Sequence, residues 1–397
     1  GVCGSMIMRR RPYSDAMADD LLSRARDLRR QLDANGANAE AANSAISDVS
    51  VALMQEAGLY GAMIPEAAGG SELSISELLD LFAEVSYADG STGWCLMANT
   101  AAASYFAAWC PDSFVDEAFG GDRTPIVAGQ FAPNGTAVPV DGGYEIAGDF
   151  SFGSGIAHAD WVGTGSFTVP PEGEDAEYRL ALVPVDEAQV KGNWDVLGLR
   201  STWSLDYRVD STVPADRTFE FFAPTRYRGG PMYDLGVICL TEVGHAGWAF
   251  GVVRRALEEV TTLARGHQRM TGKSTLGDDP RFQYELGVLE SRFRAAETWT
   301  RAAFERCERS AIDGAPDEKA ILEARQATAF VTQEGTRIIE ALYNNAGTAA
   351  LRDGPIQRCF RDIHAGSQHA MVSPMQTYDF VGDVLASAAE DPLDVEL

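Results

Sequence analysis

"TPIVAGQFAPNGTAVPVDGGYEIAGDFSFGSG", residues 124–155, is the part of the sequence that decides the fold. Short runs of apolar and β-branched residues alternate here with Gly, Pro, Asn and Asp, which is typical of strands joined by tight turns. Within it, "VDGGYEI" (140–146) predicts a β-hairpin in which Gly142 and Gly143 supply the positive φ of the turn. The middle of the chain is therefore expected to be a β domain.

The sequence on both sides of this stretch is helical in character. Residues 14–120 are rich in Ala, Leu and Arg, and the chain after residue 237 keeps apolar residues three or four positions apart over several long stretches. The fold class is thus α+β. We expect three domains: N-terminal helices (1–123), a central barrel-like β domain (124–230) and a C-terminal four-helix bundle (231–397).

Composition limits the classes of partner. The chain has 397 residues, 45% of them hydrophobic, and a formal net charge of −26, which argues against nucleic acid or an anionic membrane as the main partner. Six cysteines are scattered without a CxxC pair, and we find neither a signal peptide nor an apolar run of about 18 residues. We expect a cytoplasmic protein without a metal site, since the histidines show no metal-binding spacing.

Several motifs, in order along the chain, resemble the acyl-CoA dehydrogenase superfamily. They include "GLYGAMIPEAAGG" (58–70), the β stretch already quoted, "VLGLRSTWSLDYRVDSTVPADRTF" (196–219), "HQRMTGKSTLGDDPRFQ" (267–283) and "NNAGTAALRDGPIQRCFRDI" (344–363). The resemblance runs from about residue 15 to residue 390. It implies the acyl-CoA dehydrogenase fold, with a helical N-terminal domain, a central β domain and a C-terminal four-helix bundle.

The superfamily has two branches with different chemistry. Dehydrogenases hold FAD and oxidise an acyl thioester, which requires a carboxylate to remove a proton. In the family this Glu lies eight residues after the Asp that corresponds to Asp362, and that position is Ala370 here. The family's variant position is Thr241, and Glu242 lies one residue away. A dehydrogenase that uses Glu242 therefore remains the alternative, and a non-catalytic member of the fold is a third.

The sequence "RDIHAGSQHAMVSP" (361–374) resembles the other branch, the two-component flavin-dependent monooxygenases similar to group D hydroxylases. Their oxygenase component takes reduced flavin, FMN or FAD, from a separate reductase and forms a flavin hydroperoxide with O2, which hydroxylates or N-oxygenates a small organic substrate. The resemblance assigns His369 as a base near the substrate. A histidine with an ordinary pKa of roughly 6.5 moves protons at neutral pH. His364 lies about 140° around a helix from it, so the two are expected to face different ways.

The same resemblance proposes the residues that hold flavin. Ser154 is expected to donate a hydrogen bond near the reactive ring edge, and Gly155 to let the backbone approach the ring. Arg269 and Gln283 are expected to reach the phosphates from a neighbouring subunit, which implies a homotetramer. The other expected flavin contacts are Gln130, Pro133, Thr202 and Ser204.

The substrate stays open at the level of sequence. Candidate substrate-binding residues are Trp94, Asn99, His158 and His245. Several phenol hydroxylases of the branch carry a histidine where this chain has Ala102 and Ala103, so a less polar substrate or another kind of oxygenation is equally compatible.

Overall fold

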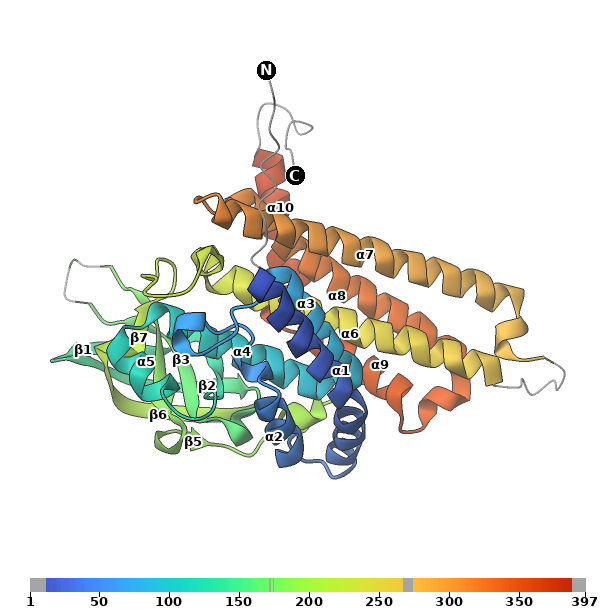
Figure 1. Cartoon of the computed structure of the whole chain (residues 1–397), viewed down its shortest axis with the longest axis horizontal. Helices are drawn as coiled ribbons and strands as arrows, with labels where there is room; N and C mark the ends of the chain where they lie inside the picture. Colours follow the sequence, from blue (N-terminus) through green and yellow to red (C-terminus); the bar gives the residue numbers. More distant parts are fainter. Residues whose placement is uncertain (1–11, 171–172, 174, 267–273, 388–397) are drawn as a thin grey trace, which may run out of the picture.

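The computed structural model describes residues 12–170, 173, 175–266 and 274–387. The chain forms N-terminal helices, a central sheet and C-terminal helices, as the sequence predicts. Figure 1 shows the sheet at one end of the molecule and the long C-terminal helices at the other, with the N-terminal helices between them.

The first part is helical. Its helices are α1 (Pro12–Ala41), α2 (Asp48–Glu56), α3 (Ile75–Ala88), α4 (Gly90–Trp109) and α5 (Asp112–Phe119). Ser74 caps α3 in a reciprocal capping box with Glu77. Nearly every residue of α4 is buried, because this helix lies between the sheet and the C-terminal helices. Residues of α4 are therefore in a position to contact both.

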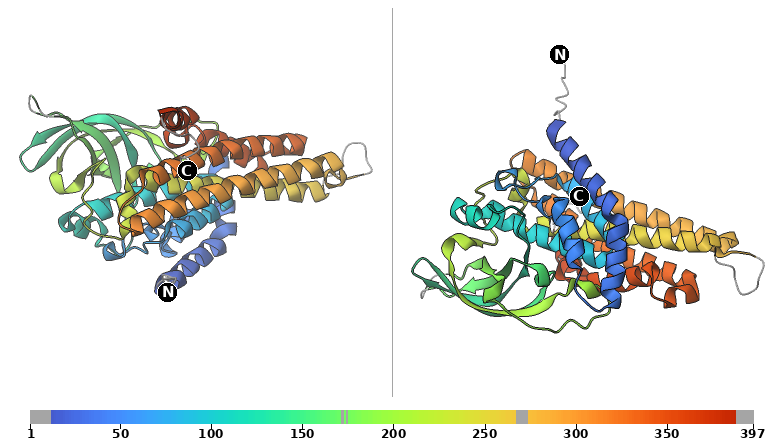
Figure 2. Two further views of the ribbon diagram at one scale, coloured as in Figure 1. Left: turned by 90° about the horizontal axis from the view of Figure 1, so that it is seen from above. Right: turned by 60° about the horizontal axis from the view of Figure 1, so that its bottom comes forward.

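The central part is one seven-stranded sheet. Its strands are β1 (Val127–Val140), β2 (Gly143–Gly153), β3 (Trp161–Thr168), β4 (Tyr178–Pro184), β5 (Gln189–Val190), β6 (Leu205–Pro214) and β7 (Thr218–Glu220). The order is β5-β6-β2-β1-β3-β4-β7, and only the β1–β3 pair is parallel. Figure 2 shows the curvature of this sheet.

The predicted hairpin joins β1 to β2, with Val140 opposite Gly143. One detail of the prediction is wrong. Gly142 has φ +78°, but Gly143 does not lie in the left-handed region. It is the first residue of β2, and a Cβ there would overlap the carbonyl oxygen of Val213 in β6. Gly143 thus serves close strand packing rather than the turn.

The C-terminal part consists of α6 (Gly236–Gly266), α7 (Pro280–Ile312), α8 (Glu318–Ala346), α9 (Pro355–Gly366) and α10 (Pro374–Ser387). Both figures show α6, α7 and α8 running side by side, and α3 packs along α6. One apolar core includes the N-terminal and the C-terminal helices, and a second, smaller core lies in the sheet domain.

Helix α6 is more apolar than the sequence analysis assumed. Within the described residues, the segment Pro231–Gly266 is long and apolar enough to cross a membrane by length and composition alone, which corrects the expectation that no run is long enough. However, 83% of its apolar window is buried inside the protein. A core helix of a soluble protein passes the same test.

Candidate active site

Trp94 of α4 links two groups of predicted site residues. On one side its indole N–H donates to the hydroxyl of Ser154 (3.1 Å), which lies 2.8 Å from the hydroxyl of Ser204. The hydroxyls of Ser204 and Thr202 are also 2.8 Å apart, and Thr202 donates to the carbonyl of Leu199. Since each hydroxyl has one proton, the bond from Thr202 to Leu199 sets the direction of this series of hydrogen bonds. Ser204 therefore donates to Thr202, and Ser154 donates to Ser204. The structure thus brings Ser154, Thr202 and Ser204 together.

Gly155 follows Ser154 in a turn that only glycine fits well. Its φ is +73°, and a Cβ would lie 2.6 Å from the side-chain oxygen of Asn99. The Asn99 amide donates to the carbonyls of Val127 and Ser154, both at 2.9 Å. Asn99 therefore holds this turn against α4.

Phe152, two residues before Ser154, is a feature that the sequence analysis missed. It has φ +63°, which is costly for an aromatic residue, and 61% of its surface is exposed. Trp194 contacts it edge-on, with 6.3 Å between ring centroids. Leu199 and Trp203, in the turn that carries Thr202, also have positive φ. Strained backbone that surrounds one group of polar residues is a common property of binding sites.

On the other side of Trp94 lie two histidines. His245 of α6 and His369, at the N-cap of the short helix η10 (Ala370–Val372), have ring centroids 4.3 Å apart. Trp94 lies 5.1 Å from His245 and 5.7 Å from His369. Trp248 packs edge-on against Trp94 at 5.0 Å. Three helical segments that are distant in sequence thus build one aromatic cluster (Trp94, His245, Trp248 and His369).

Burial keeps both imidazoles neutral. It lowers the pKa of His369 to about 4, and burial together with the adjacent His369 holds the pKa of His245 well below its ordinary value. The assumption of an ordinary pKa for His369 is therefore corrected. The Met371 N–H donates to Nδ1 of His369 at 3.3 Å, which fixes the ring. The role of His369 as a base stays a prediction.

His364 faces elsewhere, as expected from its helical position. Its ring stacks on Phe360 at 4.3 Å, and its Nδ1 lies 2.9 Å from the Phe360 carbonyl. His158 is turned toward α2, where its Nε2 lies 3.0 Å from a carboxylate oxygen of Asp48. In the described part of the chain, neither ring contacts His245 or His369.

The remaining predicted flavin residues are dispersed. The Gln130 side-chain oxygen accepts from the Ser151 N–H, so Gln130 connects β1 with β2, and Pro133 is exposed on β1. Gln283 is exposed in the first turn of α7 and donates to the carbonyl of Gly277. Arg269 lies outside the described residues. Within one subunit, Gln283 thus makes no contact with the Ser154 group among the residues described.

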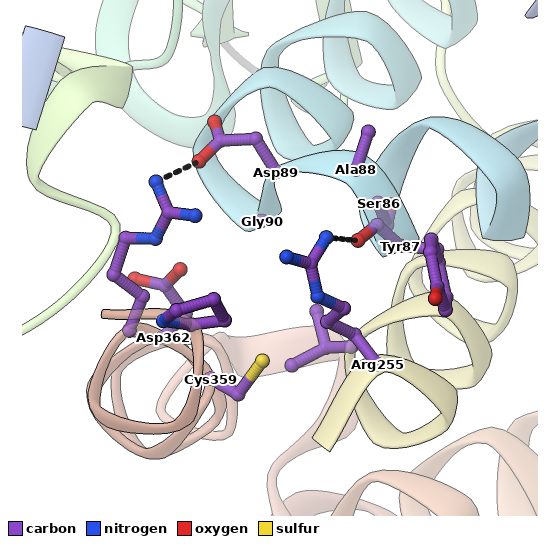
Figure 3. A pocket seen from close by; sticks show the side chains of 11 residues that line it. Ser86, Tyr87, Ala88, Asp89, Gly90, Arg255, Cys359 and Asp362 are labelled. Carbon is purple, nitrogen blue, oxygen red and sulfur yellow. Dashed lines mark hydrogen bonds and ion pairs between the residues drawn. The ribbon is translucent and has the colours of Figure 1, made fainter. Parts of the chain in front are cut away.

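Asp362 of α9 connects the C-terminal helices to the Leu199–Ser204 turn. Its carboxylate accepts from the Leu199 N–H at 2.7 Å, and a Cβ at Gly90 would lie 2.6 Å from its other oxygen. Figure 3 shows Asp362 and Asp89 beside a small cavity between the α3–α4 junction, α6 and α9. Burial, and secondly the charge of Asp89, raise the pKa of Asp362 to about 7. Because this bond joins segments that are distant in sequence, the residues around Asp362 alone do not predict it.

Glu242, the alternative base, lies against Arg325 of α8. It is fully buried and lies 3.7 Å from Nε of Arg325 in α8, and within the described residues its oxygens have no hydrogen bond. Burial raises its pKa well above the ordinary value, and Arg325 opposes this only in part. Its direct environment is the interior of the C-terminal helices.

Comparison with known families agrees with this architecture. Residues 19–112 match the model "Acyl-CoA dehydrogenase, N-terminal domain", and residues 243–374 match "Acyl-CoA dehydrogenase, C-terminal domain". The solved structure of XiaF from Streptomyces sp., in complex with FADH2 and glycerol, superposes with a TM-score of 0.85 at 23% identity and covers 96% of this chain and 98% of its own. That similarity supports the fold.

Two curated relatives address the chemistry. Indole-3-acetate monooxygenase of Pseudomonas putida is 29% identical over 82% of this chain and 83% of its own length. The flavin-dependent monooxygenase oxygenase subunit HsaA of Rhodococcus jostii is 27% identical over 85% of this chain and 91% of its own. The chain belongs to the acyl-CoA dehydrogenase superfamily, in its branch of flavin-dependent monooxygenases. These relatives favour the monooxygenase over the dehydrogenase that would use Glu242.

Proposed function

We propose that this protein is the oxygenase component of a two-component system, which uses reduced flavin and O2 to oxygenate a small aromatic substrate. The observation that carries the proposal is the position of Trp94. Its N–H bonds to Ser154 in the predicted flavin site, and its ring packs against His245 and His369 in the predicted substrate site. One side chain thus contacts both predicted ligand sites.

The residues around Ser154 fit a flavin. The chain of hydroxyl groups offers polar atoms along one edge, the positive φ of Gly155 brings the backbone close, and the exposed ring of Phe152 offers a flat apolar face. The hydroxyl of Ser201 is buried without a partner in the described residues, so a further polar atom is free for a ligand. When bound, reduced flavin supplies two electrons and, with O2, the oxygen atom that is transferred.

The protein residues have distinct tasks in this proposal. The hydroxyl of Ser154 donates its hydrogen bond to the edge of the flavin ring instead of to Ser204, while the bond from the Trp94 N–H keeps the Ser154 oxygen in place. Asp362 fixes the turn that presents Thr202 and Ser204. The aromatic cluster limits the access of water to the substrate side, because Trp94, His245 and Trp248 are buried and His369 is only partly exposed.

An aromatic substrate follows from the aromatic cluster and from the relatives, one of which is named for indole-3-acetate. In place of a polar histidine, Ala102 and Ala103 are buried on α4 and add no hydrogen-bonding group. We therefore place substrate recognition by hydrogen bonds at α6 and η10, and hydroxylation at carbon and oxygenation at nitrogen are both compatible with it.

We further propose a homotetramer that receives reduced flavin from a separate reductase. Exposed apolar side chains on α7 and α10 support further association, among them Tyr284, Met375 and Phe380, which are 76%, 75% and 52% exposed. A neighbouring subunit is also the proposed source of the phosphate contacts of Arg269 and Gln283. The five described cysteines form no disulfide, which is compatible with a cytoplasmic location.

The test is anaerobic mixing of the protein with reduced FMN or FAD, followed by O2 and a panel of indoles, phenols and amines. We expect an oxygenated product from at least one aromatic compound, with an absorbance transient that free reduced flavin does not give. If no product forms and an acyl-CoA instead bleaches tightly bound FAD, the protein is a dehydrogenase.

A further inference from the structure

His245 is a buried histidine without a hydrogen bond. Only 3% of its surface is exposed, and neither ring nitrogen has a partner in the part of the chain that the structure describes. Buried polar side chains in native proteins nearly always have a partner, in the protein or in a bound molecule. Leu and Met would fill the same volume at lower cost, so this imidazole points to a ligand.

The adjacent His369 already uses one of its nitrogens. Its Nδ1 accepts from the Met371 N–H, and a neutral imidazole has a single proton, which must then be on Nε2. As long as this bond persists, Nε2 of His369 donates a hydrogen bond and does not accept one. Both ring nitrogens of His245 are without a partner among the described residues, so His245 is the member of the pair that has an acceptor nitrogen for a ligand.

The surroundings of the pair indicate the class of ligand. The ring of Trp94 packs against both histidines, and Trp248 packs edge-on against Trp94. Trp94 is held by Ser154, and Trp248 donates to the carbonyl of Gly90 at 2.9 Å. Rigid aromatic walls favour a flat aromatic molecule. Two neutral imidazoles attract no charge, so the polar group of that molecule is itself uncharged.

We propose that His245 accepts a hydrogen bond from an aromatic N–H or O–H of the substrate, such as the N–H of an indole or the O–H of a phenol, and that His369 is the donor of the pair. This assignment rests on the proposed function, because it identifies the substrate class of the same site. It gives the specificity-determining contact to His245, which the sequence analysis names only as one of four candidate substrate-binding residues, whereas the motif around His369 assigns His369 as a base.

Binding to the protein without flavin tests the assignment separately from oxygenation. We would titrate indole and 1-methylindole, and then phenol and anisole, by quenching of Trp fluorescence and by calorimetry. For at least one pair, the wild type is expected to bind the unmethylated member about tenfold more tightly. This is the ratio of dissociation constants that one hydrogen bond produces. His245→Phe keeps a flat ring and should reduce that ratio to about one, mainly by weakening the unmethylated ligand.

His364→Phe is the matched control, since His364 stacks on Phe360 outside the cluster, and it should keep the wild-type ratio. Thermal melting checks that each variant folds, and His245→Asn, which retains an acceptor, replaces His245→Phe if that variant does not fold and should keep part of the ratio. The proposal is overturned if the wild type shows no preference within either pair, or if the preference persists in His245→Phe. Product formation by the wild type with reduced flavin would still stand in both cases.

Discussion

Replacement of Asp362 by Asn should change how the stability of the protein depends on pH. Burial and Asp89 raise the pKa of Asp362 to about 7, whereas an Asp in an unfolded chain has a pKa of about 3.9. Between these values the folded state holds a proton that the unfolded state has released. Stability from this group is therefore fully present below about pH 4 and is lost as the pH rises through 7. Asn cannot ionise, but its side-chain oxygen still accepts from the Leu199 N–H.

The magnitude follows from the shift. The slope is about 1.4 kcal/mol per pH unit up to about pH 7 and vanishes above it, so the wild type loses about 3 kcal/mol through this group between pH 5 and pH 8. The free energy of unfolding of Asp362→Asn, relative to that of the wild type, should thus increase by about 3 kcal/mol from pH 5 to pH 8. Denaturant unfolding at constant ionic strength and protein concentration measures the difference.

The control is Asp210→Asn, which removes a carboxylate whose side chain is 71% exposed, and the pH dependence of Asp362→Asn is compared with that of this variant. If the difference between Asp362→Asn and the wild type stays constant from pH 5 to pH 8, Asp362 is ionised in the folded protein and the reasoning is wrong.

Three further variants probe the site. His369→Ala should leave the Kd of flavin unchanged and lower the product yield at least tenfold; an unchanged yield contradicts a substrate contact. Ser154→Ala removes the acceptor of the Trp94 N–H, so H2O2 released per product should rise several-fold, and an equal ratio would count against Ser154. Glu242→Gln should keep the rate of oxygenation within about twofold, because Glu242 faces Arg325; a loss of activity would mean that Glu242 takes part in the reaction.

The sequence was sufficient for the architecture because its signals are local. The Gly- and Pro-rich β stretch from 124 to 155 and the hairpin at 140–146 each depend on neighbouring residues, and the structure confirms both apart from the conformation of Gly143. The family resemblance then led to Ser154, Thr202 and Ser204, which do lie together.

Contacts between distant segments could not be predicted in this way. Nothing in the sequence around residue 245 shows that its ring meets His369, since that contact depends on how α6 lies against η10. The depressed pKa of His369 and the bond from Met371 are consequences of the same packing. The positive φ of Phe152 is likewise imposed by its surroundings, because an aromatic residue has no preference for that conformation.

Trp94 has a consequence for redesign of the enzyme. A variant that enlarges the substrate site by shortening this side chain also removes the N–H that holds Ser154, so substrate range and flavin coupling cannot be tuned independently through it. Ala102, further along the same helix, makes no such link in the described structure, since it has no polar side-chain atom. Changes of substrate size are therefore better made at residues without such a link, and Trp94 is best left as it is.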